Sequence, residues 1–187
     1  GVAAIDYFVS DEYHSPADSP QRFVETLIRL PTIRLCYQPV DIAPPVRDLP
    51  ALRNGFVTFG SFNRREKVTP DVIALWSRVL HAVARSRLVL KGSFFDKADV
   101  QRSILDAFAA HDIVADRLEF RGRSAHRDVL EAYGDLDIGL DTFPWNGGLT
   151  TCEALLMGVP VMALEGDRII GRQSAAMMHA VGLDDFI

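Results

Sequence analysis

From residue 54 onward, short runs rich in β-branched and aromatic residues alternate with longer segments whose apolar residues recur at helical spacing. Strands are predicted at 55–60, 87–91, 117–120, 137–141 and 159–163, and helices at 69–83, 97–111, 124–133, 150–157 and 172–181. Each strand precedes a helix, and strands joined by helical crossovers lie parallel in a sheet covered on both faces. Because such crossovers are almost always right-handed, the pattern predicts an α/β fold with a doubly wound, Rossmann-like parallel sheet.

The first fifty residues do not show this alternation. A helix is predicted over 21–30, and a proline-rich stretch follows it, with Pro31, Pro39, Pro44, Pro45 and Pro50. Proline fixes φ and lacks a backbone N–H, so this stretch cannot form a long helix or a central strand. We therefore expect two parts: a connecting arm over 1–50 and the Rossmann-like lobe over 51–187.

Composition narrows the functional classes. The chain has 20 Lys and Arg against 25 Asp and Glu, a formal charge of −5, and an acidic chain without a continuous basic stripe is not expected to bind nucleic acid. No apolar run predicts a membrane span or an export signal. Cys36 and Cys152 lack the spacing of a zinc site or a disulfide framework. A cytoplasmic protein fits these features, and the start at Gly1 in place of Met suggests a piece of a longer chain.

Polar and cationic residues follow the first three predicted strands. In an open parallel sheet, ligands bind beyond the carboxyl ends of the strands, so these residues should gather at one edge. They are Asn63, Arg64, Arg65 and Lys67 after the first strand, Lys91 at the end of the second, and Arg121, Arg123 and His126 after the third. The run from 60 to 65 is not a G-x-G-x-x-G motif, which argues against an NAD-dependent dehydrogenase.

The densest polar segment, 141–153, follows the fourth strand. Gly147 and Gly148 are expected to adopt positive φ and to bring the backbone close to a ligand, while Thr150 and Thr151 open a helix that can hold a diphosphate. Glu153 in the first turn is placed to accept hydrogen bonds from ribose hydroxyls. Taken singly, these residues are better explained as ordinary helix-capping groups. Their convergence on one edge favours nucleotide binding, with Lys67 neutralising the phosphates.

Several separated motifs, in order, resemble the C-terminal catalytic lobe of the O-linked N-acetylglucosamine transferase and SPINDLY family. They are GFVTFGSFN (55–63) with Lys67, LDTFP (140–144), TTCE (150–153) and MGVP (157–160), and the stretch around Leu30, Pro31 and 35–39 is similar to the family's inter-lobe link. The resemblance covers nearly the whole chain. It implies the donor-binding lobe of a GT-B glycosyltransferase, with 1–50 as the inter-lobe connector and part of an N-terminal-lobe arm.

The resemblance also implies roles for individual residues. Lys67 would be the catalytic diphosphate lysine, Thr150 and Thr151 the phosphate-binding helix start, Glu153 the ribose carboxylate, and Asn63 with Arg64 the adjoining contacts. The family needs no metal or other cofactor, and it transfers a sugar to Ser or Thr hydroxyls with inversion. A family histidine near the base is replaced here by Val129, and His126, one helical turn earlier, can serve instead. Another family histidine corresponds to Gly148 or Leu149.

The resemblance leaves the donor open. UDP-N-acetylglucosamine is the first expectation, whereas the spelling Thr151, Cys152, Glu153 leans toward SPINDLY-like members, some of which use GDP-fucose. The implied partners are the nucleotide sugar, an acceptor protein, the missing N-terminal lobe and upstream tetratricopeptide repeats. This chain alone is therefore expected to be inactive in transfer. The alternatives are a GT-B enzyme for lipid, sugar or small-molecule acceptors and a nucleotide-binding or protein-interaction module without catalysis.

Overall fold

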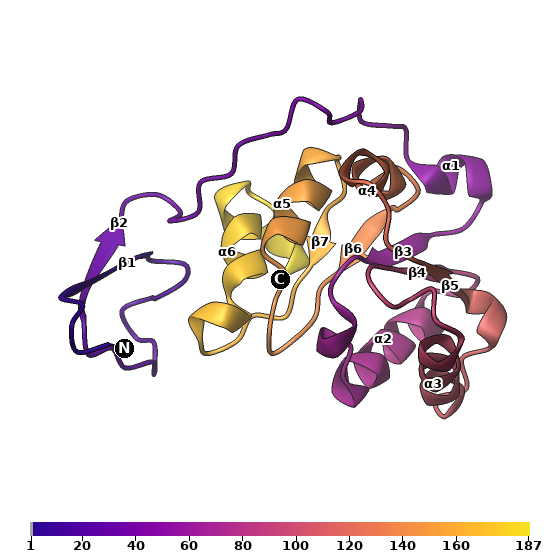
Figure 1. Cartoon of the computed structure of the whole chain (residues 1–187), viewed down its shortest axis with the longest axis horizontal. Helices are drawn as coiled ribbons and strands as arrows, with labels where there is room; N and C mark the ends of the chain where they lie inside the picture. Colours follow the sequence, from indigo (N-terminus) through magenta and orange to yellow (C-terminus); the bar gives the residue numbers. More distant parts are fainter. Residues whose placement is uncertain (1) are drawn as a thin grey trace.

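A computed structural model describes residues 2–187 of the chain (Figure 1). The strands are β1 (Tyr7–Asp11), β2 (Thr26–Leu30), β3 (Thr58–Ser61), β4 (Arg87–Lys91), β5 (Leu118–Arg121), β6 (Ile138–Leu140) and β7 (Val161–Met162). The α-helices are α1 (Pro50–Asn54), α2 (Pro70–Ala82), α3 (Ala98–Ala109), α4 (His126–Tyr133), α5 (Leu149–Leu156) and α6 (Gln173–Ala180). Short 3-10 turns lie at Arg65–Lys67, Ala115–Arg117, Ile169–Gly171 and Asp184–Phe186.

The main sheet has five parallel strands in the order β5-β4-β3-β6-β7. The chain builds outward from β3 to β5, returns through α4, and places β6 on the other side of β3. Helices α2 and α3 therefore pack on one face, and α4, α5 and α6 pack on the other (Figure 1). The predicted doubly wound parallel sheet is confirmed.

Strand β4 shows how the sequence supplies both cores. Because successive side chains of a strand point to opposite faces, Leu88 and Leu90 pack with α2 and α3, whereas Val89 packs with α4 and α5. The first core also contains Trp76 of α2 and Phe108 of α3, both fully buried. Helices on both faces thus explain the continuous apolar run of this strand.

Helix α2 begins where the sequence predicts it. The Thr69 hydroxyl accepts a hydrogen bond from the Val72 N–H at 3.3 Å, and Pro70 occupies the first helical position, where no N–H is needed. The loop that carries Lys67 therefore ends at a defined residue, the N-cap Thr69.

Asp137 joins three segments at the amino end of β6. Its buried carboxylate accepts hydrogen bonds from the Ala51 N–H at 2.8 Å and the Thr58 N–H at 2.7 Å. Asp137→Ala should lower the free energy of unfolding by about 2–4 kcal/mol, because both donors lose their acceptor. Urea unfolding measures this, and a loss below about 0.5 kcal/mol would contradict the structural role.

The arm differs from its prediction. Residues 26–30, expected in a helix, form β2, which pairs in parallel with β1 in the register Tyr7 to Thr26 through Asp11 to Leu30. The predicted helix over 21–30 is therefore wrong, since pairing with a strand nineteen residues earlier overrides the local helical pattern. The proline-rich connector then runs past the α6, α5 and α4 side of the sheet to α1 (Figure 1).

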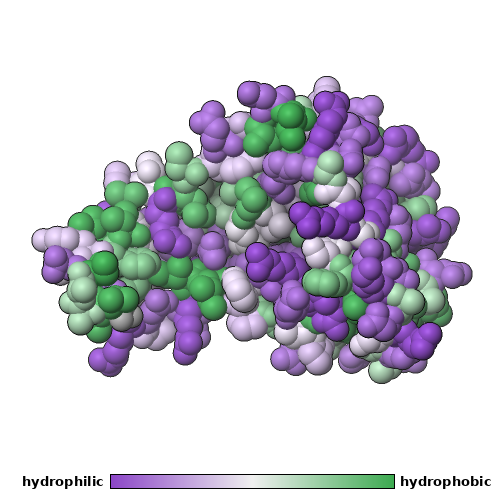
Figure 2. Space-filling view, in the orientation of Figure 1, coloured by the Kyte–Doolittle hydropathy of each residue, from purple (hydrophilic) through white to green (hydrophobic). Residues whose placement is uncertain are grey.

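The arm is tied to the lobe by polar contacts and exposes apolar side chains elsewhere. Arg172 Nε donates to the Tyr13 carbonyl at 2.7 Å, and the Ile169 N–H donates to Gln21 Oε1 at 2.9 Å. Figure 2 shows apolar surface gathered over the β1–β2 end of the molecule, where Tyr7 and Val9 are exposed. Within residues 2–187, no helix is both long and apolar enough to cross a bilayer.

Candidate functional site

The predicted site residues lie around the point where β3 and β6, neighbours in space, lead into loops that diverge to opposite faces of the sheet. The loop after β3 carries Asn63, Arg64 and Lys67, and the loop after β6 leads from Asp141 to the start of α5. A topological switch of this kind opens a crevice at the carboxyl edge of the sheet. The structure thus brings segments almost eighty residues apart to one edge.

Lys67 lies in the 3-10 turn after β3, and protein groups hold its ammonium. Nζ donates to the Asn146 carbonyl at 2.7 Å and to Asn63 Oδ1 at 3.2 Å, and it lies 4.9 Å from the centre of the Trp145 ring. Burial lowers the pKa of Lys67, the Asp141 carboxylate opposes this, and Arg64 lowers the pKa further. An ammonium has three donors, so one remains for a ligand oxygen.

Asp141, at the end of β6, anchors the loop before α5. Its Oδ1 accepts from the Gly147 N–H at 2.7 Å, from the Thr142 N–H at 2.8 Å and from Asn63 Nδ2 at 3.1 Å. Burial raises the pKa of Asp141, while the Ser174 side chain, those backbone N–H groups and Lys67 lower it. The loops after β3 and β6 are therefore locked together by one carboxylate oxygen.

The glycine pair before α5 does not behave as expected. Gly148 has φ −132°, and Gly147 is not among the glycines with positive φ, so the expectation of positive φ is wrong. Gly147 is needed for space instead, because a Cβ there would lie 2.4 Å from Thr151 Oγ1 and 2.8 Å from Thr150 Oγ1. The missing side chain lets the loop pass directly over the helix start.

The two threonines are not equivalent. Thr151 is buried, and its hydroxyl lies 2.8 Å from Ser174 Oγ, so this hydroxyl serves packing between α5 and α6. Thr150 is half-buried, and its carbonyl accepts from the Tyr133 hydroxyl at 2.9 Å. The Thr151 and Cys152 N–H groups both bond to the Gly148 carbonyl at 3.1 Å, which leaves the Leu149 and Thr150 N–H groups as the free donors expected at a helix N-terminus.

Glu153 and His126 form a second polar pair. His126 Nε2 lies 2.7 Å from Glu153 Oε1, which joins the start of α4 to the first turn of α5, and Glu153 is buried while His126 is partly exposed. Both line a hollow of about 430 Å³. Its other lining residues include Lys91, Arg123 and Val129. The hollow therefore combines two cations with an oriented carboxylate.

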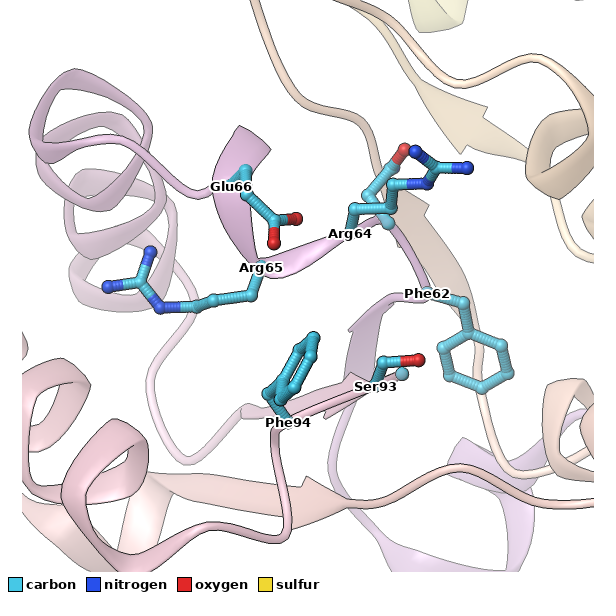
Figure 3. Close-up of a pocket in the computed structure, with 8 residues that line it drawn as sticks. Phe62, Arg64, Arg65, Glu66, Ser93 and Phe94 are labelled. Carbon is cyan, nitrogen blue, oxygen red and sulfur yellow. The ribbon is translucent and has the colours of Figure 1, made fainter.

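Two further hollows lie along the same edge. One of about 440 Å³ is lined by residues 62–66 and 92–94, and Figure 3 shows Phe94 reaching toward the Arg65–Glu66 segment while Arg64 and Arg65 point in opposite directions. The other, of about 430 Å³, is lined by Lys67 and Trp145, by the charged residues Arg64 and Glu66, and by Thr69 and three apolar residues. Lys67 and Glu153 thus line separate hollows, and the loop after β3 borders both.

The sequence did not single out Asp141, Asn146 or Ser174 as parts of this arrangement. Asp141 was marked only as the last residue of the predicted strand 137–141, as the first of the polar segment 141–153 and as a member of the LDTFP motif, whereas Asn146 contributes a backbone carbonyl that any residue carries. Within residues 2–187, no group of three or more His, Cys, Asp or Glu side chains is arranged to hold a metal ion.

Comparisons with known proteins agree on one family. The sequence profile of glycosyl transferase family 41 matches residues 37–187. The chain is 39% identical, over its whole length, to the probable UDP-N-acetylglucosamine--peptide N-acetylglucosaminyltransferase SPINDLY of Eustoma exaltatum subsp. russellianum and to that of Arabidopsis thaliana. It spans 20% and 21% of these relatives, about a fifth of their length.

A solved structure agrees with the sequence relatives. A mutant of the Thermobaculum terrenum O-GlcNAc transferase matches 98% of this chain and 34% of its own, with a TM-score of 0.84 and 35% identity. The sucrose-phosphate synthase of Thermosynechococcus elongatus has a TM-score of 0.52 at 16% identity, which supports the fold alone.

Proposed function

The chain belongs to glycosyl transferase family 41, and from that membership we propose that it is the donor-binding lobe of a protein O-glycosyltransferase. Its fold is that of the GT-B lobe expected from the sequence. In this proposal, residues 51–187 hold a nucleotide sugar, and residues 1–50 link this lobe to an N-terminal lobe. The longer protein transfers the sugar to Ser or Thr hydroxyls in the cytoplasm.

The observation that carries the proposal is the convergence of Lys67, Asn63 and the free N–H groups of α5 at the switch point. A helix N-terminus and a partly buried ammonium are suited to a diphosphate, because both supply positive charge in a site shielded from water. They would stabilise the diphosphate as its bond to the anomeric carbon breaks. We propose that this positive charge replaces a metal ion, so that transfer is metal-independent.

The proposed position of the diphosphate also sets the direction from which the acceptor must attack. A Ser or Thr oxygen would attack the anomeric carbon from the side opposite the departing diphosphate, which inverts the configuration at that carbon. The hydroxyl proton must leave to a base, and we place that base in the N-terminal lobe. This chain alone is therefore expected to bind nucleotide without transferring sugar.

The hollow beside Glu153 supports a site for the nucleoside. Glu153 can accept hydrogen bonds from the ribose hydroxyls, and the contact with His126 orients its carboxylate. The base would lie toward Lys91, Arg123 and Val129, which also line this hollow. Lys91 is held there by the Ser124 hydroxyl at 2.9 Å and the Gly122 carbonyl at 3.2 Å.

The donor is best tested by a ligand panel. UDP and UDP-N-acetylglucosamine should raise the unfolding temperature, because a ligand at a hundredfold excess over its dissociation constant adds about 2.7 kcal/mol to stability. Thermal shift and calorimetry with UDP, UDP-N-acetylglucosamine, GDP and GDP-fucose measure this. Preferential binding of GDP and GDP-fucose would indicate a fucosyltransferase of SPINDLY type. Absence of saturable binding for all four nucleotides would contradict the proposed function.

A further inference from the structure

Asp141 is a buried acidic residue to which the proposed reaction gives no role. Its exposed fraction is 6%, and it lies directly after β6 at the switch point. Three donors converge on its Oδ1: the backbone N–H groups of Gly147 and Thr142 and the side-chain amide of Asn63. Three hydrogen bonds to this one oxygen fix the position of the carboxylate and of the groups that donate to it.

The contact with Asn63 continues to Lys67. Asn63 uses its amide nitrogen toward Asp141 Oδ1 at 3.1 Å, which leaves its Oδ1 to accept from Lys67 Nζ at 3.2 Å. The reverse orientation of the amide would point its donors at the ammonium and its oxygen at the carboxylate. Asp141 thereby determines which end of Asn63 faces the lysine.

We propose that Asp141 is the positioning residue of the anion site: through Asn63 it aims the Lys67 ammonium, and through the Gly147 amide it fixes the turn that opens α5. This inference rests on the proposed function, because it explains how the two halves of the phosphate site are held in register. One carboxylate oxygen of Asp141 links the loop after β3, which carries Lys67, to the loop before α5. Its charge also favours the protonated form of the lysine that it aims.

Electrostatics at the site agree with this role. Burial and Arg64 both lower the pKa of Lys67, and Asp141 is the acidic group that raises it. Glu66 lies on the same turn and lines the hollow beside Lys67. A diphosphate needs the ammonium form, which is lost as pH rises through the pKa of Lys67. Removing the Asp141 charge should lower that pKa and move the loss of binding to lower pH.

The chain offers a direct measurement, because it contains three lysines: Lys67, Lys91 and Lys97. Their Cε signals in a protein labelled with ¹³C-lysine can be followed by NMR as the pH is raised. Asp141→Asn should lower the pKa of Lys67, because the carboxylate that raises it is lost. Asp137→Asn is the matched control, since Asp137 is equally buried, lies at the other end of β6 and also accepts two backbone N–H groups.

Binding supplies the second measurement. Calorimetry with UDP should show about a tenfold weaker affinity for Asp141→Asn, since a hydrogen-bonded charge is lost from the support of the site. As the pH is raised, Asp141→Asn should begin to lose UDP affinity at a lower pH than the natural chain does. Asp137→Asn should show the same pH dependence of UDP binding as the natural chain. Asn63→Ala, which breaks the link but leaves the Gly147 contact, should weaken UDP binding in the same direction and serves if Asp141→Asn does not fold.

Two outcomes would overturn the inference: a Lys67 pKa unchanged in Asp141→Asn, or an equal change in Asp137→Asn. If Asp141→Asn does not fold, unchanged UDP affinity in Asn63→Ala would overturn it as well. The NMR titration needs no ligand, so it remains decisive if UDP does not bind. Failure of the natural chain to bind UDP, UDP-N-acetylglucosamine, GDP and GDP-fucose alike would count against the proposed function, and the lysine titration would then test the role of Asp141 by itself.

Discussion

Lys67→Ala should weaken binding of UDP by roughly 10- to 100-fold. The substitution removes a charge-assisted donor to phosphate, an interaction of about 1.5–3 kcal/mol, and each 1.4 kcal/mol is a tenfold change in affinity. Two of the three ammonium donors are already held by Asn146 and Asn63, so the third is aimed and little ordering is needed on binding. Isothermal calorimetry at neutral pH measures the change.

Lys97→Ala is the control for the loss of a lysine charge. Its side chain is 60% exposed and pairs with Asp96 on the surface, so UDP affinity should be unchanged. Thermal unfolding of both variants shows whether the fold is retained. Equal affinity of Lys67→Ala and the natural chain would remove Lys67 from the phosphate site, even if UDP binds elsewhere in the lobe.

Gly147→Ala should cost stability and UDP affinity together. A Cβ at this position would lie 2.4 Å from Thr151 Oγ1, 2.8 Å from Thr150 Oγ1 and 3.1 Å from Asp141 Oδ1, so the loop must move away from the helix start. Overpacking of this kind costs about 1–3 kcal/mol of stability. Because the Gly147 N–H is bonded to Asp141, the shift also breaks the link between the two loops, and UDP binding should fall at least tenfold.

Gly148→Ala separates this steric effect from a general effect of glycine replacement. The nearest atom to a Cβ at Gly148 is Gln173 Oε1 at 3.4 Å, the end of a flexible side chain. Urea unfolding and UDP calorimetry should therefore show a clearly smaller loss for Gly148→Ala than for Gly147→Ala. Similar losses in the two variants would show that the close contact with the threonines does not matter.

Much of the lobe could be predicted because its signals are local. The capping threonine and proline that open α2, and the apolar run of β4 buried on both faces, are readable from neighbouring residues. The helix expected over 21–30 failed for the opposite reason. There the structure depends on the pairing of β2 with β1, and a short amphipathic run does not reveal its partner.

The sequence indicated which residues belong to the candidate site, but it did not indicate how their side chains are arranged in space. The loops that follow β3 and β6 were identified from their polar residues, and the structure places them at one edge of the sheet. The inward hydroxyl of Thr151, the spatial need for Gly147 and the separation of Lys67 from Glu153 into different hollows were not visible. These features depend on side-chain packing between α5, α6 and the loops.

The order of apolar runs and helix signals alone determined the doubly wound sheet and the edge where a ligand can bind, because secondary structure is encoded by residues close in sequence. Only the tertiary structure decided that Asp141, Asn63 and Lys67 form one connected chain of contacts. Asn63 and Asp141 are 78 residues apart, and they meet because β6 returns to lie beside β3. Strand order and packing create that contact, and no local pattern specifies it.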